Sequence, residues 1–570
     1  MVKKIILAGV GAGIVIGASY AGFFVLKKSQ LATPIVIQGC SAQCAIISGM
    51  VVPHHDLVKA QRTELFAHVG EMIEEPRTVI LISPNHYGAG KATVQTTNQT
   101  WQIDEGTIEP DISVLSSIID HGASMEPASF INEHGIYLIL NDIKRTFPNA
   151  RIVPIIFKID TPSTNVQKLH DALKKSCDQC LVVASVDFSH YQPAVLANEH
   201  DQLSIRALKN LDEDAIREKA EVDSPPSLQF LIAWARSHNT ERFELANHTN
   251  SGELLSNPDI ETTTHLFGYY TEGERTMPER RVSFFIGGDM MFARGIHATF
   301  EKDLKESVAH LGDRLFWGTD AALINLEGAI SSTRVKPDPG PTFKFVFPPE
   351  TVSVLKYMHI NAVSLANNHS INAGSGGEEV TRQLLSKQNI QAIGGWSGVD
   401  TVRTATFSGQ GLKLTIIGVH MLLDIPDIQD QISKIKSDPD QRVIIFPHWG
   451  VEYEPRHSAQ QERLARAWID AGADMVIGSH PHVIQDAEIY RGKPIIYSLG
   501  NLLFDQDWSV PTQQGMLIGG AFTDDGVELF GLPTISKNHQ PELARGALKQ
   551  NLLQKLWSSI TPSDIIKILN

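Results

Sequence analysis

Short apolar runs that end in polar side chains constrain the fold of this chain more than any other feature. In the second half these runs are rich in Val and Ile and are separated by amphipathic stretches. They lie at residues 282–286, 321–325, 362–365, 443–446, 475–477 and 494–497. The first half repeats the pattern at residues 78–83, 152–157 and 181–185. Runs that are apolar on both faces are typical of buried strands in mostly parallel sheets, so the sequence predicts α/β layering in both halves.

Chemically active side chains follow the apolar runs of the second half. In open α/β sheets, ligands bind in the crevice beyond the carboxyl ends of the strands, where several strands deliver side chains to one place. The side chains at these ends are Asp289, Glu327, Asn367, Asn368, His369, His448, His480, His482 and Asn501. A single aspartate at a strand end is more often a helix cap, and a single histidine is often a core residue. The convergence of the whole set nevertheless predicts a functional site.

The set combines imidazole nitrogens with carboxylate and amide oxygens, which suit divalent Zn, Mn or Fe. His480 and His482 are two residues apart, so both point to one side of an extended segment. Asp289 or Glu327 could bridge two ions that clamp the attacking and leaving oxygens of an in-line displacement. His369 directly follows an asparagine pair and is predicted to act as a general acid.

The second half carries the ordered motifs "GDMMFARG", "NLEG", "SLANNHSINAG", "HWGVEYE", "AGADMVIGSHPHVIQ" and "YSLGNLLF". Over roughly residues 281–505, this set resembles the capsule synthesis family (CapA, poly-γ-glutamate type). The resemblance implies a calcineurin-like metallophosphoesterase fold, membrane anchoring, and an association with making or exporting poly-γ-glutamate at the cell envelope. It places Asp289, Glu327, Asn368, His448, His480 and His482 at metal-site positions, with His369 as the acid.

One position departs from the wider metallophosphoesterase pattern. Those enzymes usually begin their site with Asp-x-His, and both residues hold one metal. Here Met291 stands two residues after Asp289. The resemblance therefore leaves open whether one or two ions bind, and the sequence does not identify the substrate.

The first half places a second set of histidines and carboxylates after its apolar runs. The motifs "MVVPHHD", "VILISPNHYG", "NEHG" and "VVASVDFSHY" supply His54, His86, Glu133, His134, Asp187 and His190. Two histidines with one carboxylate form the facial arrangement of non-haem Fe(II) sites, which leaves positions open for substrate. The sequence therefore predicts a second metal site in the first half.

This second set resembles the Memo family, in particular AmmeMemoRadiSam system protein B, over roughly residues 44–270. The resemblance implies a fold similar to class III extradiol dioxygenases, with His54 and His86 as metal-ligand or active-site histidines. It places Glu133, His134, Asp187 and His190 at other pocket positions. The family has a cysteine near a Gly-x-x-Pro stretch, where this chain reads "EVDSPPSL", and Asp223 is a candidate replacement ligand. Two alternatives stay open: His190 is catalytic or structural, and this half is an active enzyme or an inactive descendant kept as a binding module.

The N-terminus carries the longest apolar stretch of the chain. Residues 5–26 are uncharged and mostly apolar, with lysines immediately before and after them. A helix of this length can cross a hydrocarbon core of about 30 Å. No clear A-x-A site follows, so we prefer an uncleaved single-pass anchor to a signal peptide. The expected topology is a short cytoplasmic N-terminus and an extracytoplasmic body.

The cysteines fall into two short-spaced pairs, Cys40 with Cys44 and Cys177 with Cys180. The pairs lie too far apart in the chain to match a compact zinc module. They are therefore either ordinary small residues or, for Cys177 and Cys180, a local disulfide in a domain outside the cytoplasm.

The 570 residues are too many for one typical core and suit two domains. A charged segment with Pro and Gly near residues 270–281 separates the two halves. The predicted segments are a membrane anchor at residues 1–29, a Memo-like domain at 30–272, a CapA-like domain at 280–545 and a C-terminal tail at 546–570.

These patterns predict a membrane-anchored, metal-dependent hydrolase or transferase that acts on an anionic envelope polymer or a phosphorylated envelope precursor. The rivals are an inactive metal-containing module that binds such a polymer or a partner protein, and an Fe(II) oxygenase in the first half. The net charge of −15, without a long basic run beyond the N-terminus, argues against nucleic acid as a partner. Metal identity and oligomeric state stay open.

Overall fold

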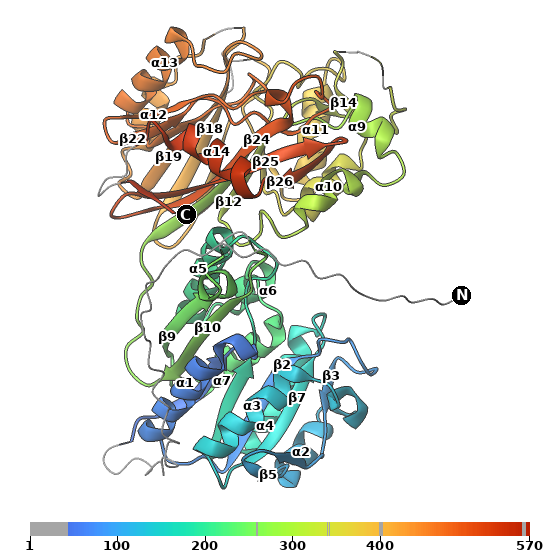
Figure 1. Cartoon of the computed structure of the whole chain (residues 1–570), viewed down its shortest axis with the longest axis vertical. Coiled ribbons are helices and arrows are strands. Elements are labelled where there is room, and N and C mark those ends of the chain that lie inside the picture. Colours follow the sequence, from blue (N-terminus) through green and yellow to red (C-terminus); the bar gives the residue numbers. More distant parts are fainter. Residues whose placement is uncertain are drawn as a thin grey trace, which may run out of the picture. The chain divides into compact units, whose positions relative to one another are not determined.

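The computed structural model describes residues 44–257, 260–338, 340, 343–397, 403–423, 425–560 and 566–569. The first and second halves are each built on sheets of their own (Figure 1). The exact limits of the four predicted segments stay predictions.

One mixed sheet forms the first half, drawn from blue to green in Figure 1. In spatial order its strands are β6 (Ser124–Met125), β3 (Val94–Thr96), β7 (Arg151–Phe157), β2 (Thr78–Pro84), β8 (Cys180–Ser185), β1 (Ile47–Val52), β10 (Thr264–Thr271) and β9 (Arg242–Asn250). The central strands β7, β2, β8 and β1 are parallel, so their carboxyl ends meet at one edge of the sheet.

Helices cover both faces of this sheet, which explains why its central strands are apolar throughout. The covering helices are α1 (Lys59–Met72), α2 (Ile112–Ile119), α3 (His134–Thr146), α4 (Ser163–Ser176) and α7 (Pro225–Ser237). Along β2, Val79 and Leu81 enter the core that contains residues of α1 and α3. Ile80 and Ile82 enter the opposite core, which contains residues of α2, α4 and α7. This alternation follows from the two-residue repeat of a strand.

A disulfide bond joins Cys177 to Cys180. Cys177 directly follows α4 and Cys180 begins β8, so the bond closes the short connection between these two elements. The sequence left two interpretations of this cysteine pair open, and the structure supports the local disulfide.

Two facing sheets form the second half. The first contains β16 (Gln391–Ile393), β15 (Ala362–Ser364), β12 (Ala321–Leu326), β11 (Arg281–Met290), β24 (Gln514–Thr523), β25 (Val527–Lys537) and β26 (Gln540–Leu543), with β23 (Asn501–Leu503) beside β11 and β27 (Ile566–Ile568) beside β25. The second contains β17 (Thr404–Ser408), β18 (Lys413–His420), β19 (Gln441–His448), β20 (Met475–Ile477), β22 (Lys493–Ile496) and β21 (Ala487–Tyr490). In the first sheet β12 pairs in parallel with both β11 and β15. In the second sheet β19 pairs in parallel with both β18 and β20.

The inner faces of the two sheets share one apolar core. Phe284 and Leu323 enter it from the first sheet, and Ile416 and Phe446 enter it from the second. Helices close the outer faces: α10 (Thr351–Tyr357), α11 (Gly377–Ser386), α12 (Gln429–Ile435) and α13 (Ala459–Asp470). The carboxyl ends of the parallel strands of both sheets thus lie around a common core, which allows their polar end residues to meet.

The predicted fold class is wrong in one element, the N-terminal transmembrane helix. A membrane-spanning helix needs about 20 residues that are mostly apolar. Within the part of the chain that the structure describes, no helix meets both conditions, and the longest, α5 (Ala194–Asn210), has 17 residues. Residues 5–26, where this helix was predicted, lie outside the described residues.

Candidate metal centres

The second half brings its predicted site residues together at the ends of its parallel strands. Asp289 is the last residue but one of β11, and Glu327 directly follows β12. Asn367, Asn368 and His369 follow β15, and His448 ends β19. His480 and His482 follow β20, and Asn501 begins β23. Asp289, Glu327, His448, His480 and His482 are all buried.

His482 lies between two carboxylates. Its Nδ1 is 3.2 Å from Oδ2 of Asp289, and its Nε2 is 3.5 Å from Oε1 of Glu327. Asn501 contributes a third contact, with its Oδ1 2.9 Å from Nδ1 of His482. The ligand atoms of Asp289, Glu327 and His482 all lie within 4.8 Å of one another, which is close enough for one ion to reach all three.

His448 and Asn368 form the opposite side of the cluster. The Nε2 of His448 is 2.9 Å from Oδ1 of Asn368, and its ring centroid is 4.6 Å from that of His480. The amide of Asn325 connects the two sides, since its Nδ2 donates to Oδ1 of Asp289 at 2.8 Å and lies 3.3 Å from Nδ1 of His448.

Burial and mutual charge shift the protonation of this cluster. Burial raises the pKa of Glu327 to about 8, and the neighbouring Asp289 carboxylate adds to the shift. Burial opposes protonation of His482, but the carboxylates of Glu327 and Asp289 outweigh it and raise the pKa of His482 to about 9. Burial, aided by the charge of His482, lowers the pKa of His480 to about 3. Burial also lowers the pKa of His448 well below its ordinary value.

The donor set fits a divalent cation. Oε1 of Glu327 and Nδ1 of His480 are buried and make no hydrogen bond with any part of the chain that the structure describes. A buried carboxylate oxygen without a hydrogen bond is costly, and a bound ion would satisfy it. Imidazole, carboxylate and amide donors are those that Zn, Mn and Fe accept.

Met291 occupies the position at which the wider phosphoesterase pattern has a histidine. Its side chain is fully buried in the apolar core, where its sulfur accepts a hydrogen bond from the Ala293 amide. This position therefore adds no imidazole to the cluster.

The sequence analysis missed residues that reach the cluster from other segments. Glu452 is exposed, yet its carboxylate lies within 4.8 Å of the ligand atoms of His480 and His482. Its place in "HWGVEYE", four residues after His448, was the available signal. Asn325 lies one position before the end of β12 and was also missed, because it lies inside the apolar run and the pattern predicts only residues that come after a run.

Several side chains of this centre stand on backbone in the left-handed region. His480 has a φ of 97°, His482 of 58°, Tyr453 of 67° and Arg294 of 45°. Such conformations cost about 1–3 kcal/mol each for residues other than glycine, and they persist where the surrounding structure fixes them. The fold therefore holds these side chains in place at an energetic cost.

The first half brings a second group together at the shared edge of its parallel strands. His54 follows β1, His86 follows β2 and Asp187 follows β8. Nε2 of His54 is 3.4 Å from Oδ2 of Asp187 and 3.3 Å from Oδ2 of Asp223. Nε2 of His86 is 3.8 Å from the same Asp223 oxygen. The candidate replacement carboxylate thus lies between the two predicted ligand histidines.

Neighbouring groups fix the orientation of these two rings. Oγ of Ser185 is 3.2 Å from Nδ1 of His54, and Oε1 of Glu133 is 2.5 Å from Nδ1 of His86. Contacts of this kind at the far nitrogen orient metal-binding histidines in known sites. They leave the Nε2 atoms of both rings directed at Asp223.

The protonation of this group also departs from ordinary values. Burial opposes protonation of His86, but Asp223 and Glu133 outweigh it and raise its pKa to about 9. Burial opposes ionisation of Asp223, but hydrogen bonds from His54 and His86 lower its pKa. Burial lowers the pKa of His134 to about 4, with the charges of His86 and His54 adding to the shift.

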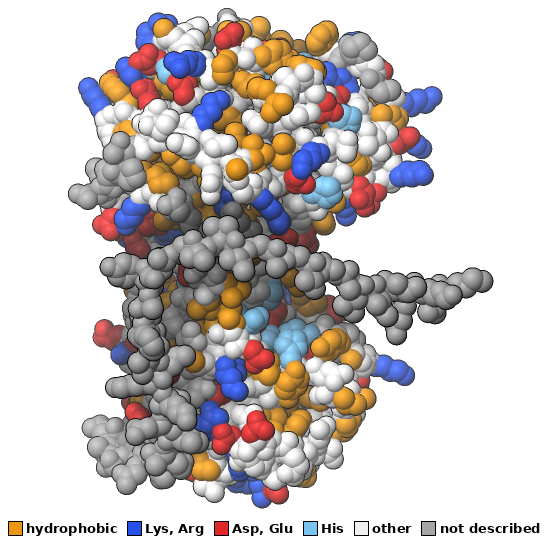
Figure 2. Space-filling model, viewed as in Figure 1, with side chains coloured by type: hydrophobic (Ala, Val, Ile, Leu, Met, Phe, Trp, Pro, Cys, Tyr) orange, Lys and Arg blue, Asp and Glu red, His pale blue; other side chains and the backbone are white. Residues whose placement is uncertain are grey.

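His134 and His190 lie at the margin of this group. The ring centroids of His134 and His86 are 3.9 Å apart, and the ligand atoms of His54, His86 and His134 lie within 4.8 Å of one another. The backbone N–H of His190 donates to Oε1 of Glu221 at 3.3 Å, and no side-chain hydrogen bond within the described chain joins His190 to Asp187 or Asp223. Figure 2 shows histidine side chains gathered in one place on the first half, and the side chains of His86 and His134 are 22% and 33% exposed.

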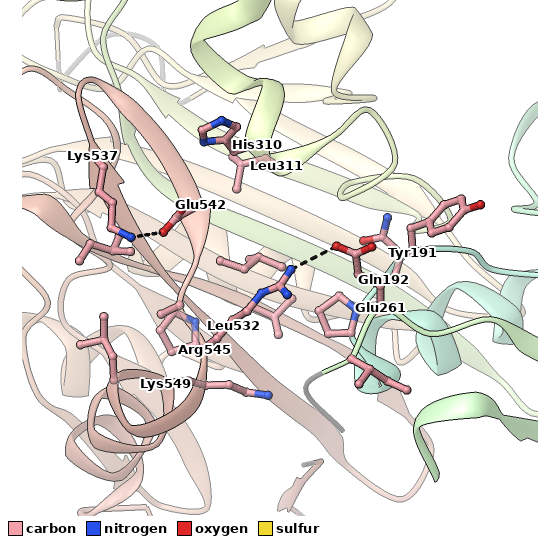
Figure 3. A pocket seen from close by; sticks show the side chains of 17 residues that line it. Tyr191, Gln192, Glu261, His310, Leu311, Leu532, Lys537, Glu542, Arg545 and Lys549 are labelled. Atoms are coloured by element: carbon pink, nitrogen blue, oxygen red, sulfur yellow. Dashed lines mark hydrogen bonds and ion pairs between the residues drawn. The ribbon is translucent and has the colours of Figure 1, made fainter. Parts of the chain in front are cut away.

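A cavity of about 580 Å³ lies away from both groups. Its walls combine apolar residues such as Leu532 with the ion pairs Lys537–Glu542 and Arg545–Glu261 (Figure 3). No candidate metal ligand lines this cavity. The metal-site candidates therefore belong to the strand ends and not to this cavity.

Two family models match the chain, one in each half. The model of the bacterial capsule synthesis protein PGA_cap matches residues 283–506, and the model of the Memo-like protein matches residues 18–262. The MEMO1 family protein of Methanosarcina barkeri is 30% identical over 243 residues, which cover 41% of this chain and 91% of that protein.

The second half is similar to two CapA proteins. The PGA biosynthesis protein CapA of Bacillus subtilis is 32% identical over 240 residues, covering 39% of this chain and 63% of that protein. The capsule biosynthesis protein CapA of Bacillus anthracis is 31% identical over 224 residues, covering 35% of this chain and 54% of that protein. The chain thus spans less than two thirds of the length of either.

The crystal structure of a phosphatase from Mycoplasma pneumoniae aligns with 46% of this chain and 96% of its own. The alignment has 12% sequence identity and a TM-score of 0.28, a value too low to support a conclusion.

Proposed function

Because the chain belongs to the Memo family in its first half and to the bacterial capsule synthesis family in its second, we propose that it acts in the synthesis of a capsule or cell-envelope polymer. In this proposal the second half is a metal-dependent hydrolase or transferase. The observation that carries it is the buried cluster of Asp289, Glu327 and His482, in which one carboxylate oxygen has no hydrogen bond among the described residues.

The residues proposed to hold the ion, or two ions, are Asp289, Glu327, Asn368, His448, His480 and His482. A bound divalent Zn, Mn or Fe would polarise a phosphoryl or acyl oxygen and would favour ionisation of a bound water. Asn325 and Asn501 orient Asp289 and His482 through the contacts described above. The low exposure of the cluster excludes bulk water from these charges, which strengthens their effect on a substrate.

His369 is proposed as the residue that transfers a proton. Its Nδ1 lies 2.9 Å from Oδ1 of Asn372, which fixes the ring and leaves Nε2 3.9 Å from Oε1 of Glu327. Burial lowers the pKa of His369 to about 4, so the resting ring is neutral and its Nε2 is a proton acceptor. In the proposed order it first accepts a proton and then donates that proton to the leaving group.

The substrate class is proposed from the relatives and from the site. The two CapA proteins are named for poly-γ-glutamate and capsule biosynthesis, which supports an anionic envelope polymer or its phosphorylated precursor. The second candidate function is an inactive metal-containing module that binds such a polymer or a partner protein. Met291 favours this alternative. A buried methionine occupies the position at which the wider enzyme pattern has a metal-binding histidine, so the cluster has one imidazole fewer.

For the first half we propose a metal site made of His54, His86 and Asp223. Two imidazoles and one carboxylate leave positions open on an ion such as Fe(II). Asp187 and His190 would line the substrate side of this site. Oxygen uptake by the iron-loaded protein with catechols would show that this half catalyses a reaction. If this half is a scaffold, we expect no oxygen uptake.

The test of the enzyme proposal is metal-dependent hydrolysis of a generic phosphate ester by the full chain. We expect His480→Ala to lose metal and activity with an unchanged thermal unfolding midpoint, and His369→Gln to keep the metal while turnover falls about 100-fold to 10,000-fold. The control is His310→Ala, which changes an exposed histidine outside the cluster. Metal-dependent polymer binding without any turnover would favour the binding module.

A further inference from the structure

Arg294 lies close to the proposed metal centre of the second half, since its guanidinium is 5.6 Å from the ring centroid of Phe504, and that centroid is 4.8 Å from the ring centroid of His482. None of the roles given above uses Arg294. It directly follows the segment that joins β11 to α9 (Arg294–Thr299). Its positive charge acts on Glu327, His369 and Tyr453, which come from three different segments around the centre. Arg294 is therefore close to both the candidate metal ligands and the candidate proton-transfer residue.

The guanidinium group of Arg294 is held in one orientation. Its Nε donates to Oδ2 of Asp505 at 3.2 Å, and its Nη2 donates to Oδ1 of the same carboxylate. The group lies over the rings of Phe345 and Phe504, with 4.8 Å and 5.6 Å to the ring centroids. The ring of Phe345 also stacks on that of His369, with 3.9 Å between the ring centroids. Arg294 and the proposed proton-transfer residue therefore both pack against Phe345.

This arrangement leaves donors of Arg294 for another molecule. A guanidinium group carries five N–H donors, and Asp505 occupies two of its three nitrogens. Within the described chain, no group accepts a hydrogen bond from its Nη1. The buried Arg62, by contrast, uses Nε, Nη1 and Nη2 for bonds within the protein, as expected for a purely structural arginine.

The charge around the centre explains why a free arginine nitrogen matters there. Asp289, Glu327 and Glu452 are carboxylates, and they disfavour the approach of an anionic substrate. A fixed guanidinium offsets this repulsion, and its planar fork matches the oxygens of a phosphate or a carboxylate. The side chain is 12% exposed, so a ligand at the centre can reach it while bulk water is largely excluded.

We propose that Arg294 binds an anionic oxygen group of the substrate, either a phosphoryl or a carboxylate group, beside the metal centre. This inference rests on the proposed function of the second half and names the residue that selects its substrate class. Arg294 contacts the substrate anion directly, while Asp505, Phe345 and Phe504 position it.

The test is isothermal titration calorimetry of the metal-loaded full chain with two probes, inorganic phosphate and glutarate. We expect Arg294→Met to weaken binding of the preferred probe by about tenfold to a hundredfold, with the metal content unchanged. Binding of phosphate alone assigns a phosphoryl group, and binding of glutarate assigns a carboxylate. Arg491→Met is the matched control, because Arg491 also pairs with a carboxylate and lies over an aromatic ring but is exposed on the turn between β21 and β22.

Arg294→Lys keeps the charge and the aliphatic stem and serves if the methionine variant fails to fold. It is expected to lose part of the affinity, because an ammonium group lacks the fork. Equal affinity in the wild type, Arg294→Met and Arg294→Lys, or no binding of either probe to the wild type, would overturn the proposal.

Turnover of the phosphate ester, measured in parallel, separates this inference from the proposed function. Arg294-dependent anion binding without turnover leaves the inference standing and removes the enzyme proposal. Turnover with a KM that Arg294→Met does not change leaves the enzyme proposal standing and removes the inference. An increase in KM of about tenfold or more in Arg294→Met, with the smaller effect on kcat, supports both.

Discussion

His482 is flanked by the carboxylates of Asp289 and Glu327, and this fixes how the metal-free protein responds to pH. Its pKa is raised to about 9 in the folded protein, against about 6.5 for a free histidine. Its contribution to stability is therefore fully present below pH 6.5 and is lost as the pH rises through 9. We expect His482→Gln to lower the free energy of unfolding at pH 6 by roughly 3 kcal/mol and to have a much smaller effect at pH 9.5.

The measurement is urea denaturation of the chelator-treated protein at both pH values. His310→Ala, at an exposed position, is the control and should show no pH-dependent difference from the wild type. An equal loss of stability for His482→Gln at pH 6 and pH 9.5 would mean that the two carboxylates do not act on a charged imidazole.

Site residues could be predicted from the sequence where they lie within a few positions of the end of an apolar run. Asp289, His448 and His54 were predicted in this way, and the structure brings each into a cluster. Arg294 was not, because its neighbour Asp505 is 211 positions away and no local pattern connects the two. A role that depends on such a distant contact becomes visible only once the chain is folded.

At the scale of elements, α14 (Gly546–Trp557) shows that part of the predicted C-terminal tail belongs to the core. Leu556 is fully buried, and Leu552 and Leu556 enter the core that both sheets of the second half share. We expect Leu556→Ala to destabilise the protein by about 2–5 kcal/mol, since it removes buried methyl groups and leaves a cavity. The measurement is the thermal unfolding midpoint, with Gln550→Ala on the exposed side of the helix as control. An unchanged midpoint would show that the helix does not contribute to the core.

The strands that the sequence predicted were those that are buried on both faces. The runs at residues 321–325 and 443–446, for example, lie within β12 and β19. The antiparallel strands β24 and β25 were not predicted, although they extend the first sheet of the second half. They carry no metal-site candidates at their ends, and glycines interrupt the apolar stretch of β24, so neither sign that identified the other strands was present.

At the scale of the whole molecule, the two candidate metal centres are built on different sheets with separate apolar cores. Substitutions at sites without shared neighbours usually have additive effects, so each centre should lose its metal independently of the other. We expect Asp289→Asn and His54→Ala each to remove part of the metal from the full chain, and the double variant to remove nearly all of it. The measurement is elemental analysis of protein purified without chelators or metal-binding tags.

Asp525→Asn and His121→Ala are the matched controls, because both change exposed residues of the same types in the same halves. Loss of metal in Asp289→Asn alone would restrict metal chemistry to the second half and make the first half a scaffold. Loss of all metal in either single variant would contradict independent centres and would mean that one half depends on the other to hold its ion. Partial loss in each, with turnover lost only in Asp289→Asn, would place the proposed hydrolase or transferase reaction in the second half and leave the first half free to bind a second ligand.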